Sequence, residues 1–350
     1  MKSNFKITNY NKIAIINTAF IGDVVLSFFL CQSIKNIQPD SKLYFVATPK
    51  VKDLLTLVTS IDVPILYDKK NIDKGFNGII NIANRLKKEK VELILSPHRS
   101  LRTSLITYLA KPKLSVSYQT SSFSFLYKQR VPYLFKSHEI ERNLELLGIF
   151  SDFQKGDQLP DIIIEFPKTV IEKVVSLINL NHLKRNIVVI APGSIWKTKQ
   201  WIKEGFIFVA SELIKMKCEV ILIGSDEDFR LCEEISIKTG AKNFAGRTNL
   251  AESLYILKNS HLLITNDSSP THLATIVKCP TITIYGPTIP EFGFYPRAPN
   301  SKIVQIEGLE CKPCSIHGYN KCPLQHHRCM SGIQPERVLS FAIEMLKNFS

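Results

Sequence analysis

The chain contains 350 residues, of which 45% are hydrophobic and 22% are charged, and its formal net charge is +14 at pH 7. This balance is typical of a folded globular protein and excludes an intrinsically disordered chain. Because the length exceeds what one ordinary core accommodates, we expect two domains. The most apolar N-terminal stretch, residues 13–31, is interrupted by Asn17 and Asp23. It is therefore a poor membrane span and a poor signal-peptide core, which favours a cytoplasmic protein.

The positive charge is concentrated in the N-terminal half. Residues 1–150 hold 22 Lys and Arg against 11 Asp and Glu, a net +11, whereas residues 151–350 hold 23 against 20, a net +3. A basic surface of this kind suits nucleic acid, an anionic membrane face or a multiply anionic substrate. It is equally typical of a solvated lysine-rich face that binds nothing.

Strands and helices alternate along the N-terminal half. Apolar runs predict strands at residues 12–17, 43–47 and 93–96, and amphipathic runs predict helices at residues 24–34, 51–59 and 103–110. No Asn-Gly turn joins paired alternating strands, so we expect a parallel sheet covered by helices on both faces.

A second series of the same kind follows a linker at residues 151–168. It comprises strands at residues 186–191, 219–223, 262–265 and 281–285, and helices at 203–215, 226–239, 251–259 and from Pro335 onward. The sequence therefore predicts an α/β protein of two Rossmann-like domains, residues 1–165 and 166–350. A ligand is expected at the carboxyl ends of the strands of both sheets.

Polar side chains follow the strand at residues 262–265. They are Asn266, Asp267, Ser268 and Ser269, and the helix after them carries His272. A helix that starts in small residues presents free backbone N–H groups, which favour the phosphates of a nucleotide. Asp267 fits an ordinary N-cap equally well, and His272 fits a helix residue with a local hydrogen bond.

Two further strand ends carry residues suited to chemistry. Asp23 stands at the start of a helix after Gly22, and it is either an N-terminal acid stabilised by the helix dipole or a general base. The Gly193-Ser194 turn offers N–H donors, and Lys199 can neutralise phosphate, whereas Lys197 reads as a solvated surface lysine. The chain has neither a Walker motif nor a G-x-G-x-x-G fingerprint, which argues against P-loop and NAD-binding proteins.

These motifs, in this order over residues 12–340, resemble the bacterial ADP-heptose:lipopolysaccharide heptosyltransferases of glycosyltransferase family 9. The resemblance is carried by Gly22-Asp23-Val24-Val25, by Ala191-Pro192-Gly193-Ser194 with Lys199-Gln200-Trp201, by Thr265-Asn266-Asp267-Ser268 with His272, and by Tyr285-Gly286-Pro287-Thr288. It is also carried by His98-Arg99-Ser100, Val131-Pro132-Tyr133 and the run from His138 to Asn143. The Cys311-x-x-Cys314 pair and the 322–330 segment are most like the heptosyltransferase II branch.

The resemblance implies a GT-B fold, in which two Rossmann-like domains face each other across a cleft. It implies transfer of L-glycero-D-manno-heptose from ADP-heptose to the inner core of lipopolysaccharide, with inversion at the anomeric carbon and no required metal or other cofactor. A sibling activity with another nucleotide sugar or acceptor stays open. So does a nucleic-acid-binding module, although the interleaved aromatic and basic repeats typical of such a surface are missing.

The resemblance also assigns residues. Asp23 matches the family's proposed catalytic base, Ser194 and Lys199 match contacts to the donor phosphates, and Asp267 matches a contact to the heptose. The complete set of donor-site candidates is Thr18, Gly22, Ser194, Lys199, Gly224, Asp267, Ser268, Ser269 and His272. Pro270 departs from the family's more frequent glycine and removes one N–H, which the first turn of a helix tolerates.

The N-terminal domain is implied to bind the acceptor, a lipid A–inner core molecule in the cytoplasmic leaflet of the inner membrane. Its net positive charge suits both the acidic acceptor and the anionic membrane surface, so peripheral membrane association is expected. Candidate acceptor contacts are His98, Arg99, Arg102, His138 and Arg142. Each fits a surface or structural residue equally well.

Four of the eight cysteines are clustered. They are Cys311, Cys314, Cys322 and Cys329, with His317, His326 and His327 nearby. The count suits a structural zinc site, although the second pair is wider than in a zinc ribbon; reduced thiols or local disulfides are the alternatives. The other four, Cys31, Cys218, Cys232 and Cys279, are expected to be small buried hydrophobes.

Overall fold

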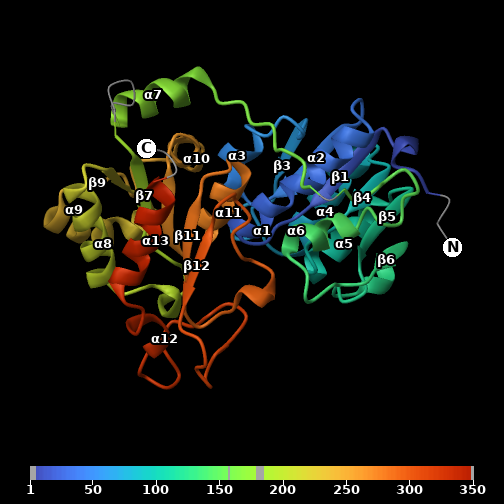
Figure 1. The fold of residues 1–350 in the computed structure, drawn as a ribbon. Coiled ribbons are helices and arrows are strands. Elements are labelled where there is room, and N and C mark those ends of the chain that lie inside the picture. Colours follow the sequence, from blue (N-terminus) through green and yellow to red (C-terminus); the bar gives the residue numbers. More distant parts are fainter. Residues whose placement is uncertain (1–4, 157, 179–184, 348–350) are drawn as a thin grey trace. The chain divides into compact units, whose positions relative to one another are not determined.

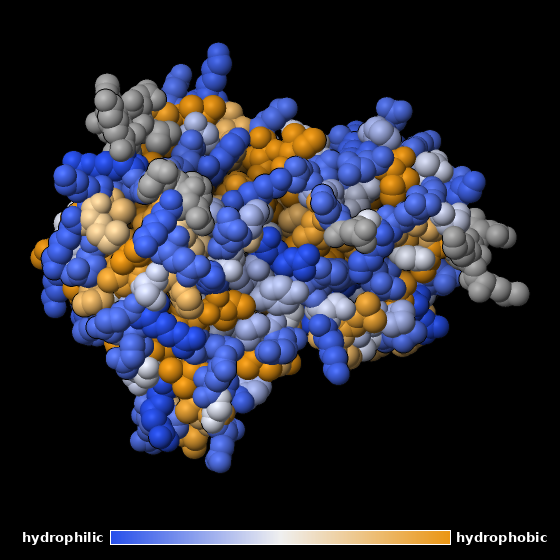
Figure 2. All heavy atoms as spheres, viewed as in Figure 1, coloured by the Kyte–Doolittle hydropathy of each residue, from blue (hydrophilic) through white to orange (hydrophobic). Residues whose placement is uncertain are grey.

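The computed structural model describes residues 5–156, 158–178 and 185–347 and divides into two compact units, Met1–Glu165 and Phe166–Ser350 (Figure 1). Each unit has one six-stranded sheet, and every pairing between named strands is parallel. Figure 2 shows a largely hydrophilic face with separate apolar patches. Within the described ranges, every helix is too short or too polar to cross a bilayer.

The N-terminal sheet has the order β3-β2-β1-β4-β5-β6. Its strands are β1 (Lys12–Ile16), β2 (Lys42–Ala47), β3 (Val63–Leu66), β4 (Leu93–Leu95), β5 (Leu114–Tyr118) and β6 (Gln129–Val131). In register, Ile13 of β1 lies between Leu43 of β2 and Leu93 of β4, and all three side chains are fully buried. Continuous apolar strands of this kind are what a parallel sheet covered on both faces requires.

The helices of this unit are α1 (Ile21–Leu26), α2 (Phe28–Ile37), α3 (Lys52–Leu55), α4 (Gly75–Lys88), α5 (Leu101–Ala110) and α6 (Glu139–Glu145). The single helix predicted at residues 24–34 is thus wrong, because two helices meet at Ser27. The Ser27 hydroxyl donates to the carbonyl of Asp23 at 2.9 Å and accepts from the Asn17 amide at 2.6 Å. Such side-chain bonds compete with regular helix geometry. The helix predicted at residues 51–59 is also too long, because the helix that forms is α3, which ends at Leu55. The backbone N–H of Thr59 donates to the carbonyl of Ile163 rather than to a helix carbonyl.

The C-terminal sheet has the order β12-β11-β10-β7-β8-β9. Its strands are β7 (Ile187–Ala191), β8 (Glu219–Leu222), β9 (Lys242–Asn243), β10 (Leu262–Asn266), β11 (Thr281–Tyr285) and β12 (Lys302–Gln305). Its helices are α7 (Lys168–Ile178), α8 (Lys203–Lys215), α9 (Phe229–Thr239), α10 (Leu250–Lys258), α11 (Ser269–Ile276), α12 (Arg328–Ser331) and α13 (Pro335–Lys347). The core under α8 and α13 includes Phe206, Ile264 and Ala342, all fully buried.

Both sheets reverse their strand order at one point, between β1 and β4 in the first and between β7 and β10 in the second. At such a switch point the connections leave in opposite directions, and the loops at the carboxyl ends of the two strands leave room for a ligand. The loops in question follow Ile16, Leu95, Ala191 and Asn266. The topology of each unit therefore selects the same loops that carry the sequence motifs.

Candidate active site

Asn266, the last residue of β10, joins the two switch-point loops of the C-terminal unit. Its side-chain N–H donates to the carbonyl of Pro192 at 2.8 Å, and its side-chain oxygen accepts from the backbone N–H of Trp201 at 3.0 Å. The side chain is fully buried. Because buried amides of this kind fix the backbone they bind, Asn266 holds the loop that carries Lys199 beside β10.

Lys199 and Asp267 form a largely buried ion pair. The Lys199 Nζ lies 2.5 Å from Oδ2 of Asp267, and the two side chains are 13% and 7% exposed. The Thr288 hydroxyl donates to the same oxygen at 2.6 Å. The N-cap of α11 is Ser268, so the carboxylate of Asp267 serves this pair rather than the helix start.

The N-terminus of α11 lacks a side-chain cap. The Ser268 hydroxyl accepts no bond from the helix and donates instead to the carbonyl of Asn266 at 3.3 Å, whereas the Ser268 carbonyl accepts from the N–H of Thr271 at 3.1 Å. Pro270 occupies the first turn, the position that tolerates it. The first turn of a helix carries unsatisfied N–H groups and a partial positive charge, and with Lys199 nearby it favours an anion.

His272 adds a polar atom without a partner. Its ring is 5% exposed, and within the described residues its Nδ1 has no hydrogen-bond partner, so the local hydrogen bond considered for it is not formed by that atom. Burial, and to a lesser degree Lys199, lowers the pKa of His272 to about 4, while Asp267 opposes the shift. At neutral pH the ring is therefore uncharged and offers a hydrogen bond without adding charge.

The remaining candidates of this unit lie on neighbouring loops. The Ser194 hydroxyl accepts from the backbone N–H of Trp196 at 3.3 Å, and Ser269 opens α11. Gly193 and Gly224 both face Asp228: a Cβ on Gly193 would overlap its carboxylate, and one on Gly224 would lie 2.8 Å from its Cβ. Both glycines are therefore explained by close packing around Asp228, whose carboxylate accepts from the backbone and hydroxyl of Ser225.

The segment from Cys311 to Cys329, here the Cys-rich segment, lies against the Lys199 loop. The hydroxyl and N–H of Thr198 donate to the carbonyl of Tyr319 at 2.8 and 3.0 Å, and that hydroxyl accepts from the N–H of Tyr319 at 2.8 Å. His327 Nε2 lies 2.8 Å from the carbonyl of Thr198. Sequence analysis missed this connection, because the two partners are 121 residues apart.

The zinc site considered for Cys311, Cys314, Cys322 and Cys329 is not formed. In the part of the chain that the structure describes, no three His, Cys, Asp or Glu side chains are placed to hold a metal ion. All eight cysteines are free thiols, and Cys31, Cys218, Cys232 and Cys279 are buried as expected. Burial raises the pKa of Cys329 to about 11, so this side chain is a neutral thiol at pH 7.

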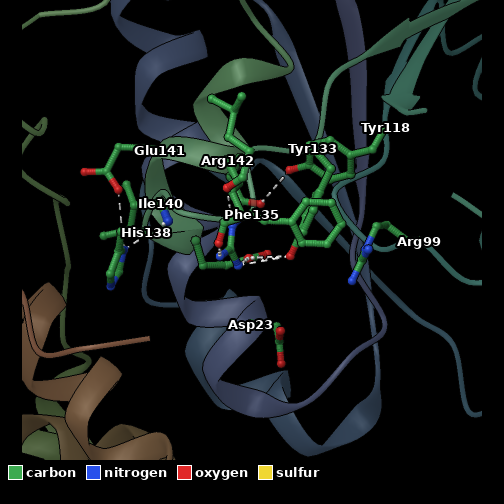
Figure 3. Close-up of polar contacts among 12 residues, drawn as sticks. Asp23, Arg99, Tyr118, Tyr133, Phe135, His138, Ile140, Glu141 and Arg142 are labelled. Carbon is green, nitrogen blue, oxygen red and sulfur yellow. Dashed lines mark hydrogen bonds and ion pairs between the residues drawn. The ribbon is translucent and has the colours of Figure 1, made fainter. Parts of the chain in front are cut away.

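In the N-terminal unit, Asp23 lies in the first turn of α1, directly after the loop that follows β1 (Figure 3). Asn17 shapes this loop: its side chain donates to the carbonyl of Asp23 at 3.1 Å and accepts from the N–H of Ala19 at 3.2 Å. Gly22 is buried within α1. The acid is thus carried on a short helix whose start is fixed by a buried amide.

His98 links the loops after β1 and β4. Its Nδ1 lies 3.1 Å from the hydroxyls of both Thr18 and Thr103, and Lys69 donates to the carbonyl of Thr18 at 2.7 Å. Burial, then Lys69 and Arg99, lower the pKa of His98 to about 4. The structure therefore gives Thr18 and His98 partners inside this unit, with the histidine neutral at pH 7.

Two of the other acceptor candidates, Arg99 and Arg142, lie against Tyr133 (Figure 3). Arg142 donates to the Tyr133 hydroxyl at 3.0 Å and lies 2.9 Å from Glu139, while the guanidinium of Arg99 lies 4.0 Å from the centre of the Tyr133 ring. His138 caps α6 by accepting from the N–H of Ile140 at 3.2 Å. Arg102 is exposed in the first turn of α5. Sequence analysis missed Glu139, although it stands in the quoted run from His138 to Asn143.

Residues 79–322 match the family model of glycosyltransferase family 9 (heptosyltransferase). The chain belongs to this family. It is 27% identical, over 96% of its length and 99% of the relative's, to lipooligosaccharide heptosyltransferase 2 of Campylobacter jejuni. This glycosyltransferase is also similar to two solved structures. One is the family 9 glycosyltransferase of Veillonella parvula, with a TM-score of 0.87, 18% identity and coverage of 99% and 100% of the two chains. The other is ADP-heptose LPS heptosyltransferase II of Escherichia coli, with a TM-score of 0.77, 20% identity and coverage of 96% and 99%. The expected GT-B fold class, with two Rossmann-like units, is confirmed.

Proposed function

We propose that the enzyme transfers L-glycero-D-manno-heptose from ADP-heptose to the inner core of lipopolysaccharide, with inversion and without a metal ion. The observation that carries the proposal is the Lys199–Asp267 pair beside the uncapped start of α11. The names of the relatives support it, since they specify heptosyltransferase 2 in Campylobacter jejuni and an ADP-heptose enzyme in Escherichia coli.

In this proposal the C-terminal unit holds the donor. A lysine ammonium has three N–H donors, so Lys199 keeps Asp267 and still donates to a diphosphate oxygen. The backbone N–H groups of Ser268 and Ser269 and the hydroxyl of Ser194 complete the phosphate contacts. Lys199 and Thr288 both bind Oδ2 of Asp267, so we assign Oδ1 to a heptose hydroxyl. Within this unit, the neutral ring of His272 and the loop at Gly224 complete the proposed donor site.

Asp23 is the proposed base. Its carboxylate takes the proton of the acceptor hydroxyl while that oxygen forms a bond to the anomeric carbon, and the bond from that carbon to the diphosphate breaks with its electron pair on the leaving ADP. Attack from the side opposite the diphosphate inverts the anomeric configuration. Lys199 and the start of α11 stabilise the charge on the leaving diphosphate, the work that a metal ion does in other transferases.

The N-terminal unit is the proposed acceptor side. Its candidate contacts are His98, Arg99, Arg102, His138 and Arg142, and its basic charge suits the acidic sugars and phosphates of an inner core. Since such an acceptor is anchored in a bilayer, we also propose that the enzyme works on the cytoplasmic face of the inner membrane. Phe123 and Phe125, 50% and 68% exposed, stand on the segment that packs against α5 and are suited to enter a lipid surface.

The test compares wild type with Asp23→Asn. Release of ADP is followed with ADP-heptose and an inner-core acceptor, and ADP affinity is measured by calorimetry. Loss of a general base predicts a fall in turnover of roughly 10²–10⁴-fold with ADP affinity unchanged. Turnover close to wild type contradicts the assigned base. Substituting other nucleotide sugars and acceptors distinguishes heptosyl transfer from a sibling activity, and NMR of the product reports its anomeric configuration.

A further inference from the structure

Glu139 is a buried carboxylate near Asp23 to which the proposed mechanism gives no role. It opens α6, is 6% exposed, and its Oε2 lies 2.9 Å from the Arg142 guanidinium and 3.5 Å from the Tyr133 hydroxyl. Helix α6 packs against α1, the helix that carries Asp23 (Figure 3). Burying a carboxylate costs free energy, so a buried glutamate at this position needs a physical or functional reason.

The positive charge next to Glu139 is shared. Arg142 also donates to the carbonyls of Leu134 and Phe135 at 3.0 and 2.7 Å and to the Tyr133 hydroxyl at 3.0 Å. The Tyr133 ring is contacted by two guanidinium groups, that of Arg99 at 4.0 Å and that of Arg142 at 4.9 Å. The guanidinium group of Arg142 is therefore held in place by these bonds.

The charges of the two arginines and two acids near Tyr133 and α1 sum to zero in only one protonation state. Two guanidinium groups, of Arg99 and Arg142, accompany two carboxyl groups, of Asp23 and Glu139, so both acids must be ionised for neutrality. A second ionised carboxylate raises the proton affinity of the first, because like charges disfavour the doubly ionised state. Protonation of Asp23 relieves that repulsion, and this occurs as the acceptor hydroxyl gives up its proton.

We propose that Glu139, held by Arg142 and Tyr133, is a positioning residue that makes Asp23 a stronger base. This rests on the proposed role of Asp23. Glu139 does not touch the substrate; it acts through its charge, which it carries on the helix packed against α1.

The charge state of Glu139 makes the proposal measurable. Burial, reinforced by Asp23, raises the pKa of Glu139 to about 7, although Arg142 and Arg99 oppose the shift. The groups that face it are Asp23 from α1, Arg99 from the loop after β4, Tyr118 from β5, Tyr133 from the loop after β6, and Arg142 from α6. Burial raises the pKa of both tyrosines, which stay neutral at pH 7. Glu139 is therefore ionised above and protonated below about pH 7.

The experiment measures kcat against pH for wild type, Glu139→Gln and Glu145→Gln, a matched control at the other end of α6. Wild type and the control are expected to gain activity as pH rises through about 7. Glu139→Gln is expected to lose that rise and to run roughly three- to tenfold slower at high pH, with the KM for ADP-heptose unchanged. A merely structural role would lower activity at all pH values and leave the rise in place.

A wild-type pH profile in Glu139→Gln overturns the proposal. If Asp23→Asn is inactive and Glu139→Gln is unaffected, only this inference fails; if Asp23→Asn is active, the assigned base itself fails. Should Glu139→Gln not fold, infrared titration of the wild-type protein with labelled glutamate replaces it. A buried carboxylic acid that ionises near pH 7 supports the proposal, and its absence refutes it.

Discussion

The Lys199–Asp267 pair allows the donor site to be tested by two substitutions with opposite consequences. Lys199→Met removes the charge and keeps the length of the side chain. Among the described residues, it leaves the Asp267 carboxylate, 7% exposed, with the hydrogen bond from Thr288 at 2.6 Å. Breaking one side of a buried pair costs about 3–5 kcal/mol, and the retained Thr288 bond places this case near the lower value. Urea denaturation measures it directly.

The same substitution is expected to weaken ADP binding. A hydrogen bond to a charged group contributes about 1.5–3 kcal/mol, which corresponds to a loss of roughly 10- to 150-fold in affinity. Asp267→Asn acts in the other direction, because it removes the carboxylate that competes with the diphosphate for Lys199. It should leave ADP affinity at or above the wild-type value and yet slow transfer from ADP-heptose, since the proposed heptose contact is lost. Calorimetry with ADP and the rate of ADP release separate the two effects.

The double variant completes a thermodynamic cycle. Groups in contact show coupling of about 0.5–3 kcal/mol, so Lys199→Met with Asp267→Asn should be more stable than the sum of the single losses predicts. If Lys199→Met binds ADP as tightly as wild type and Asp267→Asn binds it more weakly, the diphosphate is not held by Lys199. Strict additivity in the cycle would show that the pair contributes no mutual stabilisation.

Three further outcomes are expected. The folded-state pKa values of His98 and His272, about 4 against an ordinary 6.5, stabilise the protein above pH 6.5. This stability, about 3 kcal/mol per histidine, is lost as pH falls towards 4, so the melting temperature should fall steeply over that range. Phe123→Ser with Phe125→Ser should reduce sedimentation with phosphatidylglycerol vesicles, whereas Ile237→Ser, 77% exposed in α9, should not. A chelator should leave the melting temperature unchanged, because the Cys-rich segment gathers no metal ligands within the described residues; a large drop would restore the zinc hypothesis.

The positions of the candidate site residues could be predicted, because a parallel sheet binds its ligand at the carboxyl ends of its strands. Asp23, Ser194 and Asp267 each follow a buried apolar strand by a few residues, and both switch points fall at those strands. The strand β6, three residues long, carries too little pattern to be predicted, and so the segment that leads to Tyr133 and Glu139 had no assigned place.

The hydrogen-bond partner of the Asp267 carboxylate could not be predicted, because it depends on tertiary contacts. Whether Asp267 caps α11 or pairs with Lys199 depends on where a loop 68 residues earlier in the chain is held, and Asn266 fixes that loop through tertiary hydrogen bonds. The residues next to Asp267 in the sequence indicate an N-cap, because α11 begins shortly after it. They contain no sign of Lys199, which lies far away in the sequence. The helix break at Ser27 has the same origin, since the amide of Asn17 ten residues away binds its hydroxyl.

The Cys-rich segment shows how composition alone misleads about chemistry. Four thiols at short spacing fit zinc, yet the segment forms hydrogen bonds to Thr198, the residue before Lys199. Because Thr198 both donates to and accepts from Tyr319, the loop is held in one position along the segment. Lys199 reaches Asp267 from that position. The segment is thus connected to the donor site through backbone geometry, and the spacing of its cysteines carries no information about that connection.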